Sequence, residues 1–530
     1  MHMKQILCTL ALLLGVMTVA SADEFRHPGI LHSQEALDRI ASLVDKQVQP
    51  AMGSYAKLRA DRKSSFNYPM QGPFRDISRA GKYGYTKAPC EDDFNAAYYN
   101  ALMWSITRDT RHADKAMEII RAYARTLVTI HPMDAPLCAS LQGFMLVNAA
   151  EILRYTYTHK NYSNGWTEGD TEQTERMFRE VFIPVLTEFY ATKPYTNGNW
   201  GIAVNKAQIG MAVYLNDRAL YDKAIEFFYH GKDNGSLPNY IHESGQLQES
   251  GRDQAHCMLA IGCFAEIAEV AWNQGQDLYS ALDNRIMKGC EYLSKSNLGY
   301  EVPFFTWTDL TGKYSAWHTL GQAALGQWRA VFELPYNHYV ERCGLEMPYT
   351  KVVLGQIRPE GIGWTCDNPG FGTLLFYLGK GEAEPARGCI EEYPQDRLYG
   401  WSFASAGVRL VNGEMMLASS GISLAKKGLR YHCAKYPYIE VKIKHMPKQH
   451  NRRWLALSVN IMSAPEYWIF DEREAIRTDR ETYLFRVEGT KSTNGTLFPT
   501  RPTSVTLHLE FGETHGDGVR IESVKSVEKP

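Results

Sequence analysis

The sequence lacks an excess of charge of either sign. Lys and Arg number 57, Asp and Glu number 59, and the formal net charge is -2. Proteins that hold nucleic acid or an anionic membrane by bulk electrostatics carry a basic surface, so this balance excludes both modes of binding. Intrinsic disorder as the main state is also excluded, because 44% of the 530 residues are hydrophobic and 12% are aromatic. Any acidic ligand must therefore be held by a local cluster of donors.

Motifs for metals and cofactors are absent as well. The sequence contains no H-x-H, H-E-x-x-H or calcium-loop pattern, and no two cysteines form a CxxC pair. Of the ten cysteines, Cys8 lies in a predicted export signal and an odd number remains, so at least one thiol stays free. We expect no cofactor and no metal. We expect most cysteines to be small buried residues, with one or two disulfides as an open alternative.

Residues 1–22 have the pattern of a signal peptide. A short polar start is followed by an apolar run over residues 6–20 and by small residues before Asp23. No later stretch reaches ~20 uninterrupted apolar residues, so the sequence predicts no membrane span. We expect a periplasmic or secreted protein that is cleaved before Asp23.

The first part of the mature sequence has the periodicity of helices. Apolar residues recur at helical spacing in a series of segments, which cover residues 93–108, 113–127, 140–157, 170–191, 200–215, 218–230, 252–274, 280–296 and 315–333. Successive helices without a strand between them predict antiparallel helix pairs that curl into a toroid. The expected domain is an (α/α)n toroid, or incomplete barrel, over residues 23–385.

After about residue 395 the apolar period changes to two. Apolar and polar residues alternate over residues 439–444 and 505–510, which predicts half-buried strands. The pair Asn412-Gly413 between two short apolar runs predicts a two-residue hairpin. Gly and Pro in residues 381–388 interrupt both periods. The sequence therefore predicts a second domain over residues 390–530, an antiparallel β-sandwich.

The segment from Glu249 to His256 is rich in polar residues. If helical geometry already holds there, Glu249, Arg252 and His256 lie on one face. An ion-paired helix start would explain a lone E-x-x-R. However, two turns of this segment place polar groups where apolar residues could pack, and this favours a functional site.

A second group of candidates lies upstream. Asn199 and Trp200 open the next predicted helix, where a helix cap and a core indole are the simple explanation. In a functional site, the amide would offer a donor to a carboxylate and the indole a face to a sugar ring. Tyr240 and His242 add a phenol and an imidazole in a nearby loop, although a solvent-exposed histidine is the commoner case.

Five motifs in this order resemble the alginate lyase superfamily of α/α-toroid polysaccharide lyases and, within it, polysaccharide lyase family 38. They are Asn199-Trp200-Gly201, Glu249-Ser-Gly-Arg252-Asp-Gln254-Ala-His256, Gln274-Gly-Gln-Asp-Leu-Tyr279, Gly289-Cys-Glu-Tyr292 with Asn297-Leu298 and Val302-Pro303, and Tyr336-Asn-His338-Tyr339 with Arg358-Pro-Glu-Gly361. The resemblance spans about residues 30–380, and the C-terminal region carries no motif of this kind.

The resemblance implies cleavage of a 4-linked uronan by β-elimination, with mannuronate-rich alginate as the expected substrate. This reaction needs donors that neutralise the C5 carboxylate, a base for the C5 proton and an acid for the departing O4. Asn, Arg and His suit the first task, and Tyr or His the other two. The expected partner is an acidic polysaccharide, bound by a monomeric enzyme that binds no nucleic acid.

Two positions depart from the family pattern. The better-known members have an Asn-His pair where this chain has Asn199-Trp200, and they place the catalytic Tyr where this chain has Leu259. The phenol must therefore come from elsewhere. Tyr300 is placed first because it follows a glycine in a loop after a helix. Its rivals are Tyr240, Tyr336 and Tyr339.

The predicted site is therefore a set of residues that includes several distant motifs. The predicted catalytic residues are Tyr300, Asn199, Arg252, His256 and His242. The predicted substrate-binding residues are Trp200, Glu249, Gln254, Tyr240, His338 and Arg358. In one variant of this prediction, His256 and His338 meet and coordinate an ion with a carboxylate. In another, Arg358 and Trp364 form a flanking subsite.

Three other functions stay open at this point. The first is a glucuronan lyase that uses the same mechanism. The second is a toroidal glycoside hydrolase, which needs two carboxylates astride the bond and could draw on Glu243, Glu249 and Asp253. The third is a non-catalytic glycan-binding protein. A basic group around His445 and Arg453 is read as a solvated hairpin loop, with contact to a polyanion as the alternative.

Overall fold

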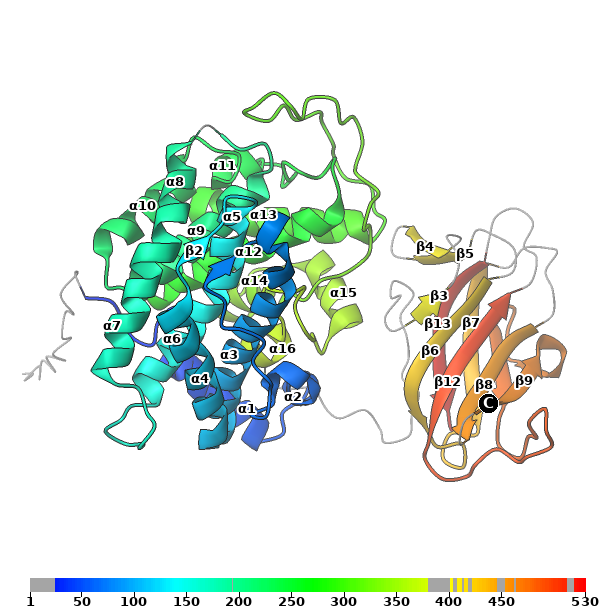
Figure 1. Cartoon of the computed structure of the whole chain (residues 1–530). Helices are drawn as coiled ribbons and strands as arrows, with labels where there is room; N and C mark the ends of the chain where they lie inside the picture. The colour runs from blue at the N-terminus through cyan, green and yellow to red at the C-terminus, as the bar shows by residue number, and fades with distance from the viewer. Residues whose placement is uncertain are drawn as a thin grey trace, which may run out of the picture.

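The computed structural model describes most of the chain (Figure 1). The described residues are 24–192, 194–379, 401–403, 408–411, 414–417, 422–445, 453–461, 464–511 and 519–530. The predicted signal peptide and the predicted domain boundary between residues 385 and 390 lie outside these ranges and stay predictions. So does most of the predicted basic loop, of which His445 and Arg453 are the described ends.

The described N-terminal part is helical. Its helices are α1 Gln34–Asp45, α2 Ala51–Ala60, α3 Lys87–Thr107, α4 Thr110–Thr126, α5 Ala135–Leu137, α6 Gly143–Thr156, α7 Glu168–Met177, α8 Ile183–Ala191, α9 Gly198–Tyr214, α10 Arg218–His230, α11 Leu237–Tyr240, α12 Gln254–Asn273, α13 Ala281–Asn297, α14 Glu333–Tyr336, α15 Pro348–Ile357 and α16 Gly372–Leu375. Short π-helical turns occupy Cys138–Gln142, Phe178–Phe182 and Asn337–Arg342. A small parallel ladder pairs β1 Asp76–Ile77 with β2 Thr129–Ile130.

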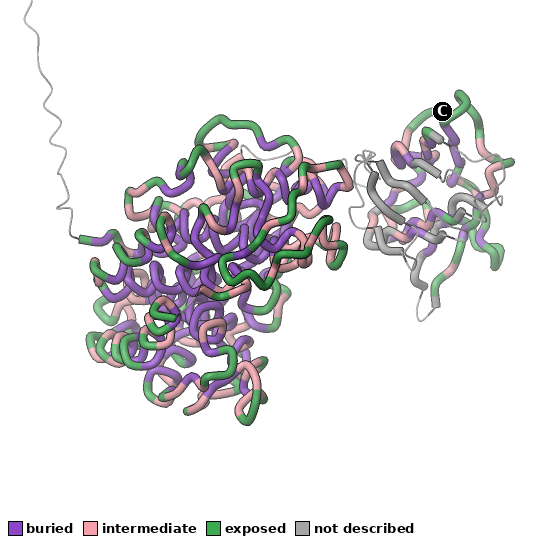
Figure 2. Tube along the Cα trace, turned by 90° about the horizontal axis from the view of Figure 1, so that it is seen from above, coloured by how far each residue is buried: buried purple, intermediate pink, exposed green. Residues whose placement is uncertain are grey.

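The helices form two layers. Helices α3, α6, α9 and α12 pack against one another in sequence and make an inner layer, while α4, α10 and α13 pack on their outer sides. The inner helices are buried nearly all round, so they lack the single apolar stripe of a surface helix. Figure 2 shows buried residues along the interior of this region and exposed residues on its loops. This arrangement brings the N-terminal ends of α9 and α12 together.

Two described helical stretches are long and apolar enough to cross a membrane. They are Ala135–Thr156 and Gln254–Asn273, by length and composition only. In the structure, 89% of the most apolar 18-residue stretch of the first segment is buried, and 83% of that of the second. Neighbouring helices therefore already cover the surfaces that a bilayer would have to cover.

The helix predicted over residues 315–333 is wrong. Residues 298–332 contain neither helix nor strand. The backbone groups of this segment bond to other parts of the chain: the Gly321 amide donates to the Ser250 carbonyl at 2.8 Å, and the Gln254 amide donates to the Ala323 carbonyl at 2.9 Å. These tertiary bonds satisfy groups that a helix would have satisfied internally. We call residues 298–332 the docking loop.

The described C-terminal strands form two antiparallel sheets. They are β3 Trp401–Phe403, β4 Val408–Val411, β5 Glu414–Leu417, β6 Ile422–Tyr431, β7 Tyr438–His445, β8 Arg453–Ile461, β9 Ala464–Asp471, β10 Ile476–Arg477, β11 Thr482–Arg486, β12 Thr503–Phe511 and β13 Val519–Val527. The strand orders are β10-β11-β7-β13-β5-β4 and β3-β6-β12-β8-β9. Val411 pairs with Glu414, which leaves two residues for the turn and confirms the predicted hairpin. The turn residues themselves lie outside the described ranges.

The two sheets share one core. Val441 of β7 and Leu507 of β12 are buried and belong to the same hydrophobic cluster, although their strands lie in different sheets. The rings of Phe470 and Phe485 also meet across the sheets, with centroids 6.3 Å apart. Alternation of buried and partly exposed residues over 439–443 is thus confirmed. The sandwich is the structure that this alternation favours.

The cysteines of the described region are all free. Cys343 is exposed and the others are buried: Cys90, Cys138, Cys257, Cys263, Cys290, Cys366 and Cys433. Burial raises the pKa of the Cys257 thiol well above its usual range. These residues therefore behave as small apolar side chains, as predicted. Cys389 lies outside the described residues.

Candidate active site

A buried carboxylate organises the meeting point of α9 and α12. Glu249 has no exposed surface. It accepts hydrogen bonds from the backbone amide of Asn199 at 3.1 Å and from the Asn199 side-chain amide at 2.8 and 2.9 Å. The Tyr240 hydroxyl donates to it at 3.1 Å, and Arg252 Nη1 donates at 2.6 Å. A buried charge must be paired and hydrogen-bonded, and Glu249 meets both conditions.

Helix α12 begins later than the sequence indicates. Its N-cap is Asp253, so Glu249 and Arg252 precede the helix and are joined by a turn in which the Arg252 amide donates to the Glu249 carbonyl at 2.8 Å. Asp253 accepts from the His256 amide at 2.9 Å, as an N-cap residue does. The three predicted residues still meet, but through a turn and a cap and not through one helical face.

Asp253 also orients the His256 ring. His256 Nδ1 lies 2.7 and 2.9 Å from the two carboxylate oxygens of Asp253. Burial alone raises the pKa of Asp253, but the hydrogen bonds from His256 outweigh it and hold the pKa below its usual range. The charged carboxylate therefore fixes the proton on Nδ1. His256 Nε2 then accepts from Arg252 Nη2 at 3.2 Å.

Arg252 and His256 are the partly exposed members of this cluster. Their side chains are 26% and 37% exposed, whereas Glu249 is fully buried. Burial lowers the pKa of Arg252, but the interaction with Glu249 raises it further, so the guanidinium remains charged. A charged donor and an imidazole therefore reach the surface above a buried anion.

The docking loop adds a phenol that was missed at the sequence level. The Tyr314 hydroxyl donates to Asn197 Oδ1, and the phenol interacts electrostatically with Arg252. Asp309 holds the loop in place by accepting from the amides of Thr311 at 2.9 Å and Tyr314 at 2.7 Å. Burial raises the pKa of Tyr314 above its usual range, although Arg252 acts in the opposite direction. The signal in the sequence was the Asp309-Leu-Thr-Gly-Lys-Tyr314 turn, in which Asp caps its own loop.

Aromatic rings flank the cluster. Tyr195 and Trp200 stack with centroids 4.4 Å apart, and Tyr195 is 37% exposed. The ring centroids of Tyr314 and Trp317 lie 4.1 Å apart. Trp317 packs so closely on Gly251 that a Cβ there would come within 2.5 Å of the Trp317 Cβ. Partly exposed aromatic faces beside charged donors suit the apolar faces and the acid groups of an acidic sugar.

Three predicted residues are buried beneath the cluster. Asn199 is 2% exposed, and Tyr240 and Gln254 are not exposed at all. The Asn199 amide and the Tyr240 hydroxyl both donate to Glu249. Gln254 donates to the carbonyls of Ser250 and Gly321 and accepts from Asn297. The prediction that these residues contact substrate is therefore corrected: Asn199 and Tyr240 position Glu249, and Gln254 anchors the docking loop.

His242 lies in a separate aromatic group. Its ring centroid lies 4.6 Å from that of Phe305 and 5.9 Å from that of Trp307. Its Nδ1 lies 3.0 Å from the Ser244 hydroxyl. Tyr300, the preferred phenol of the sequence prediction, packs its ring against Tyr349 at 5.4 Å. The roles given to His242 and Tyr300 stay predictions. Tyr314 interacts electrostatically with Arg252, as do Tyr195 and the fully buried Tyr240.

His338 lies at the opposite end of α12. It stacks on Tyr279 with centroids 3.6 Å apart and meets the edge of Trp272 at 4.9 Å. Trp272 follows His256 by 16 positions in α12, which corresponds to about 24 Å along a helix. The predicted pairing of His256 and His338 around an ion is therefore wrong, and so is the prediction that His338 joins this substrate site.

Arg358 is held by an internal ion pair. It donates to the two oxygens of Glu333 at 2.7 and 3.0 Å, and Glu333 has no exposed surface. The rings of Tyr336 and Tyr377 flank its guanidinium at 5.5 and 5.2 Å. Since a bidentate pair of this kind fixes the guanidinium, the predicted flanking subsite is corrected to a structural contact.

The remaining phenol candidates are buried elsewhere. Tyr336 is 7% exposed and Tyr339 is 1% exposed. The Tyr339 hydroxyl donates to the Tyr279 carbonyl at 2.7 Å. Burial raises the pKa of both phenols. Neither phenol offers the partly exposed oxygen that proton transfer to a polymer requires.

Comparisons with known proteins show what the chain is similar to. Residues 74–301 match the family model described as alginate lyase. Alginate lyase A1-III from Sphingomonas species A1 is 12% identical, covers 66% of this chain and 98% of its own, and superposes with a TM-score of 0.50. An alginate lyase from Bacteroides ovatus is 14% identical, covers 67% of this chain and 100% of its own, and gives a TM-score of 0.44. No curated protein matches the sequence.

Over residues 74–301 the chain is thus similar to the alginate lyase family, and its fold is similar to that of alginate lyase A1-III. The resemblance to the alginate lyase superfamily that the five motifs carry is confirmed. The predicted fold class, a helical toroid followed by an antiparallel sandwich, is confirmed as well. The assignment to polysaccharide lyase family 38 stays a prediction.

Proposed function

We propose that this protein cleaves a 4-linked uronan, with mannuronate-rich alginate as the preferred substrate, by β-elimination. One observation carries the proposal: a partly exposed guanidinium, imidazole and phenol surround one fully buried carboxylate. The match of residues 74–301 to the alginate lyase family supports the choice of substrate.

In this proposal, Arg252 binds the C5 carboxylate of the sugar, and His256 holds the guanidinium in place by accepting from Arg252 Nη2. A guanidinium carries five N–H donors, of which Glu249 and His256 engage one each, so others remain for a substrate. Neutralising the carboxylate acidifies the C5 proton and stabilises the enolate-like intermediate. Glu249 is buried beneath them and keeps the guanidinium oriented before substrate arrives.

Tyr314 transfers the proton in the same proposal. Its phenolate takes the proton from C5, the electrons of that bond form the C4=C5 double bond, and the bond from C4 to O4 breaks. The phenol then gives the proton to O4 of the leaving sugar, which restores the phenolate. One residue serves both steps because the C5 proton and O4 lie on the same face of a mannuronate ring. Arg252 favours the phenolate by its charge.

A glycoside hydrolase is a weaker candidate for this site. Hydrolysis needs two carboxylates that reach the bond from opposite sides. Glu249 is fully buried and bonded to Asn199, Tyr240 and Arg252. Asp253 caps α12 and holds His256. Of the three proposed carboxylates, Glu243 alone is exposed.

The test is to incubate the protein with polymannuronate, polyguluronate and glucuronan and to follow the ultraviolet absorbance of the unsaturated product. We expect the fastest rise with polymannuronate. Mass spectrometry of the fragments provides the control, because elimination products are lighter by one water than hydrolysis products. Saturated ends, or no cleavage of any of the three polymers, would refute the proposal. A faster rise with glucuronan would change the substrate and leave the reaction in place.

We also propose that the protein is exported and cleaved before Asp23. The apolar run and small residues of the first 22 positions support this. N-terminal sequencing of the protein recovered from the periplasm or medium of an expressing bacterium tests it. An intact N-terminus in the cytoplasmic fraction would contradict it.

A further inference from the structure

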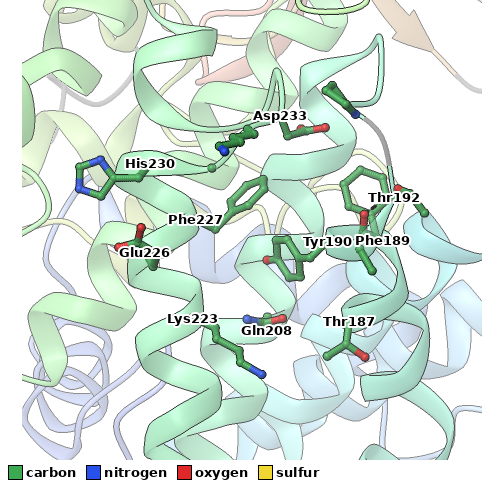
Figure 3. A pocket seen from close by; sticks show the side chains of 14 residues that line it. Thr187, Phe189, Tyr190, Thr192, Gln208, Lys223, Glu226, Phe227, His230 and Asp233 are labelled. Atoms are coloured by element: carbon green, nitrogen blue, oxygen red, sulfur yellow. Dashed lines mark hydrogen bonds between the residues drawn. The ribbon is translucent and has the colours of Figure 1, made fainter.

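A cavity of about 780 Å³ lies between α8 and α10, over the outer side of α9. Both outer helices pack on α9, whose buried Gln208 lies at the inner end of the cavity (Figure 3). None of the lining residues belongs to the cluster of Arg252, His256 and Tyr314. The volume falls in the range of sites for small organic ligands, which is about 300–1,000 Å³.

One buried acceptor in this cavity has no partner. Gln208 of α9 has no exposed surface, and its Nε2 donates to the Leu220 carbonyl at 3.2 Å. This bond fixes which end of the amide is oxygen. Gln208 Oε1 has no hydrogen-bond partner. A buried acceptor without a partner costs free energy, and a ligand with a donor would relieve that cost.

The other buried polar groups of the lining are already satisfied. The Tyr190 hydroxyl donates to Asn205 Oδ1 at 3.0 Å, and the Thr187 hydroxyl donates to the Ile183 carbonyl at 2.9 Å. Asp233 accepts from the amides of Tyr195 and Gly235, each at 2.7 Å. A ligand in the buried part of the cavity could therefore donate a hydrogen bond to Gln208 Oε1, whereas these other polar groups already have partners.

The walls and the rim restrict the ligand further. The rings of Tyr190 and Phe227 meet at 4.6 Å and lie above Gln208 in the view of Figure 3. Aromatic walls favour a flat apolar body. The charged lining groups Lys223, Glu226, His230 and Lys232 are exposed and of both signs. An anionic ligand would leave its charge unpaired in the buried part, so a neutral ligand is favoured over an anion.

We infer that this cavity is a binding site for a neutral aromatic molecule that carries a hydroxyl group, such as a phenol of two fused rings. Its ring packs against Tyr190 and Phe227, and its hydroxyl donates to Gln208 Oε1. The site is separate from the proposed catalytic cluster, and its occupation requires no chemical step.

The experiment compares two probes of nearly equal shape on the full-length protein. 2-Naphthol has a hydroxyl donor, and 2-methoxynaphthalene has the same rings without a donor. Saturation-transfer NMR and calorimetric titration should detect 2-naphthol with an affinity about tenfold higher than that of the ether, the value of one hydrogen bond to a buried acceptor. Equal affinities, or no binding of either probe, would overturn the inference. This comparison needs no variant.

Variants then locate the binding site. Gln208→Leu should remove the preference for 2-naphthol and leave the binding of the ether unchanged. Lys223→Gln, at the exposed rim, should change neither affinity. A retained preference in Gln208→Leu, with an unchanged melting temperature as evidence of folding, would overturn the inference. Displacement of 2-naphthol by mannuronate oligosaccharides would also overturn it, because the cavity would then be a saccharide subsite. Lyase activity plays no part in these readouts, so the proposed function and this inference can fail independently.

Discussion

Glu249 Oε1 lies 2.6 Å from Arg252 Nη1, and the two side chains differ sharply in exposure. The carboxylate is fully buried, while 26% of the arginine side chain is exposed. The buried member also accepts from Asn199 and Tyr240, so four donor groups fix its position. The exposed member is thereby held in one orientation at the surface, which is the arrangement a preorganised anion site requires.

Replacing the buried carboxylate should loosen this site. In Glu249→Gln the amide can still accept hydrogen bonds but no longer balances the charge of Arg252. We expect a loss of about 2 kcal/mol in the free energy of unfolding, the typical value of a hydrogen bond to a charged group. We also expect a lower kcat/KM on polymannuronate. Urea unfolding and the absorbance assay measure the two effects. Glu243→Gln, an exposed neighbour, is the control and should change neither.

Removing the hydroxyl of Tyr314 should stop catalysis. We expect Tyr314→Phe to lower kcat by about 100-fold or more, because the positioned proton donor and acceptor is lost. Stability should change little, since among the described residues the hydroxyl makes one hydrogen bond, to Asn197. Tyr300→Phe is the matched control and should retain activity. If instead Tyr300→Phe is inactive and Tyr314→Phe is active, the sequence-based choice of phenol was right.

The rate should rise with pH. Burial raises the pKa of Tyr314 above the usual ~10 of a phenol, so the phenolate that accepts the C5 proton is a minor form at neutral pH. Its fraction increases about tenfold per pH unit below that pKa. We therefore expect kcat/KM on polymannuronate to increase from pH 7 to pH 9. A flat profile over this range would show that the base is a group that is already deprotonated at neutral pH.

His338 should make the protein less stable in acid. Burial, assisted by Arg342, lowers the pKa of His338 from 6.5 to about 4. The unfolded chain therefore binds a proton at higher pH than the folded chain, and stability is lost as the pH falls from about 6.5 to about 4. The largest possible loss is about 3 kcal/mol. His338→Phe keeps the stacking on Tyr279 and should flatten this part of the profile of unfolding free energy against pH. An equally steep profile in the variant would assign the acid sensitivity to another group.

A buried ion pair in the inner layer should show strong coupling. Lys206 Nζ lies 2.8 Å from Glu266 Oε2, and both side chains are buried. Lys206→Met leaves the Glu266 charge unpaired and should cost about 3–5 kcal/mol of unfolding free energy. The double variant Lys206→Met with Glu266→Leu should recover part of this loss. A double-mutant cycle from urea unfolding measures the coupling, and additive effects would contradict it.

Local signals in the sequence were sufficient for much of the fold. The prediction of a helix over 218–230 matches α10, because Asp217 caps its start by accepting from the Leu220 amide. The period of two over 439–444 likewise matches β7. The false helix over 315–333 had apolar residues at helical spacing, but Gly321 and Ala323 bond to α12 and the turn before it. Such tertiary competition is invisible to periodicity.

The candidate site was predicted in part. Glu249, Arg252 and His256 were found because polar groups crowd a helix start, and the structure places them together. His338 and Arg358 resembled site residues by motif, but the fold uses both in internal contacts. Tyr314 was missed because it lies next to the falsely predicted helix. Its distance from Arg252 depends on how the docking loop folds back, which no local pattern records.

The attachment of Tyr314 to the docking loop separates the scaffold from its proton-transfer group. The proposed donor for the sugar acid, Arg252, lies in the turn before α12, and the Glu249 that orients it is bound by Asn199 of α9. Lengthening or shortening this connection would shift the hydroxyl along the polymer while the helical framework stays intact. The number of residues between 298 and 314 should therefore influence which sugar unit of the polymer is cut.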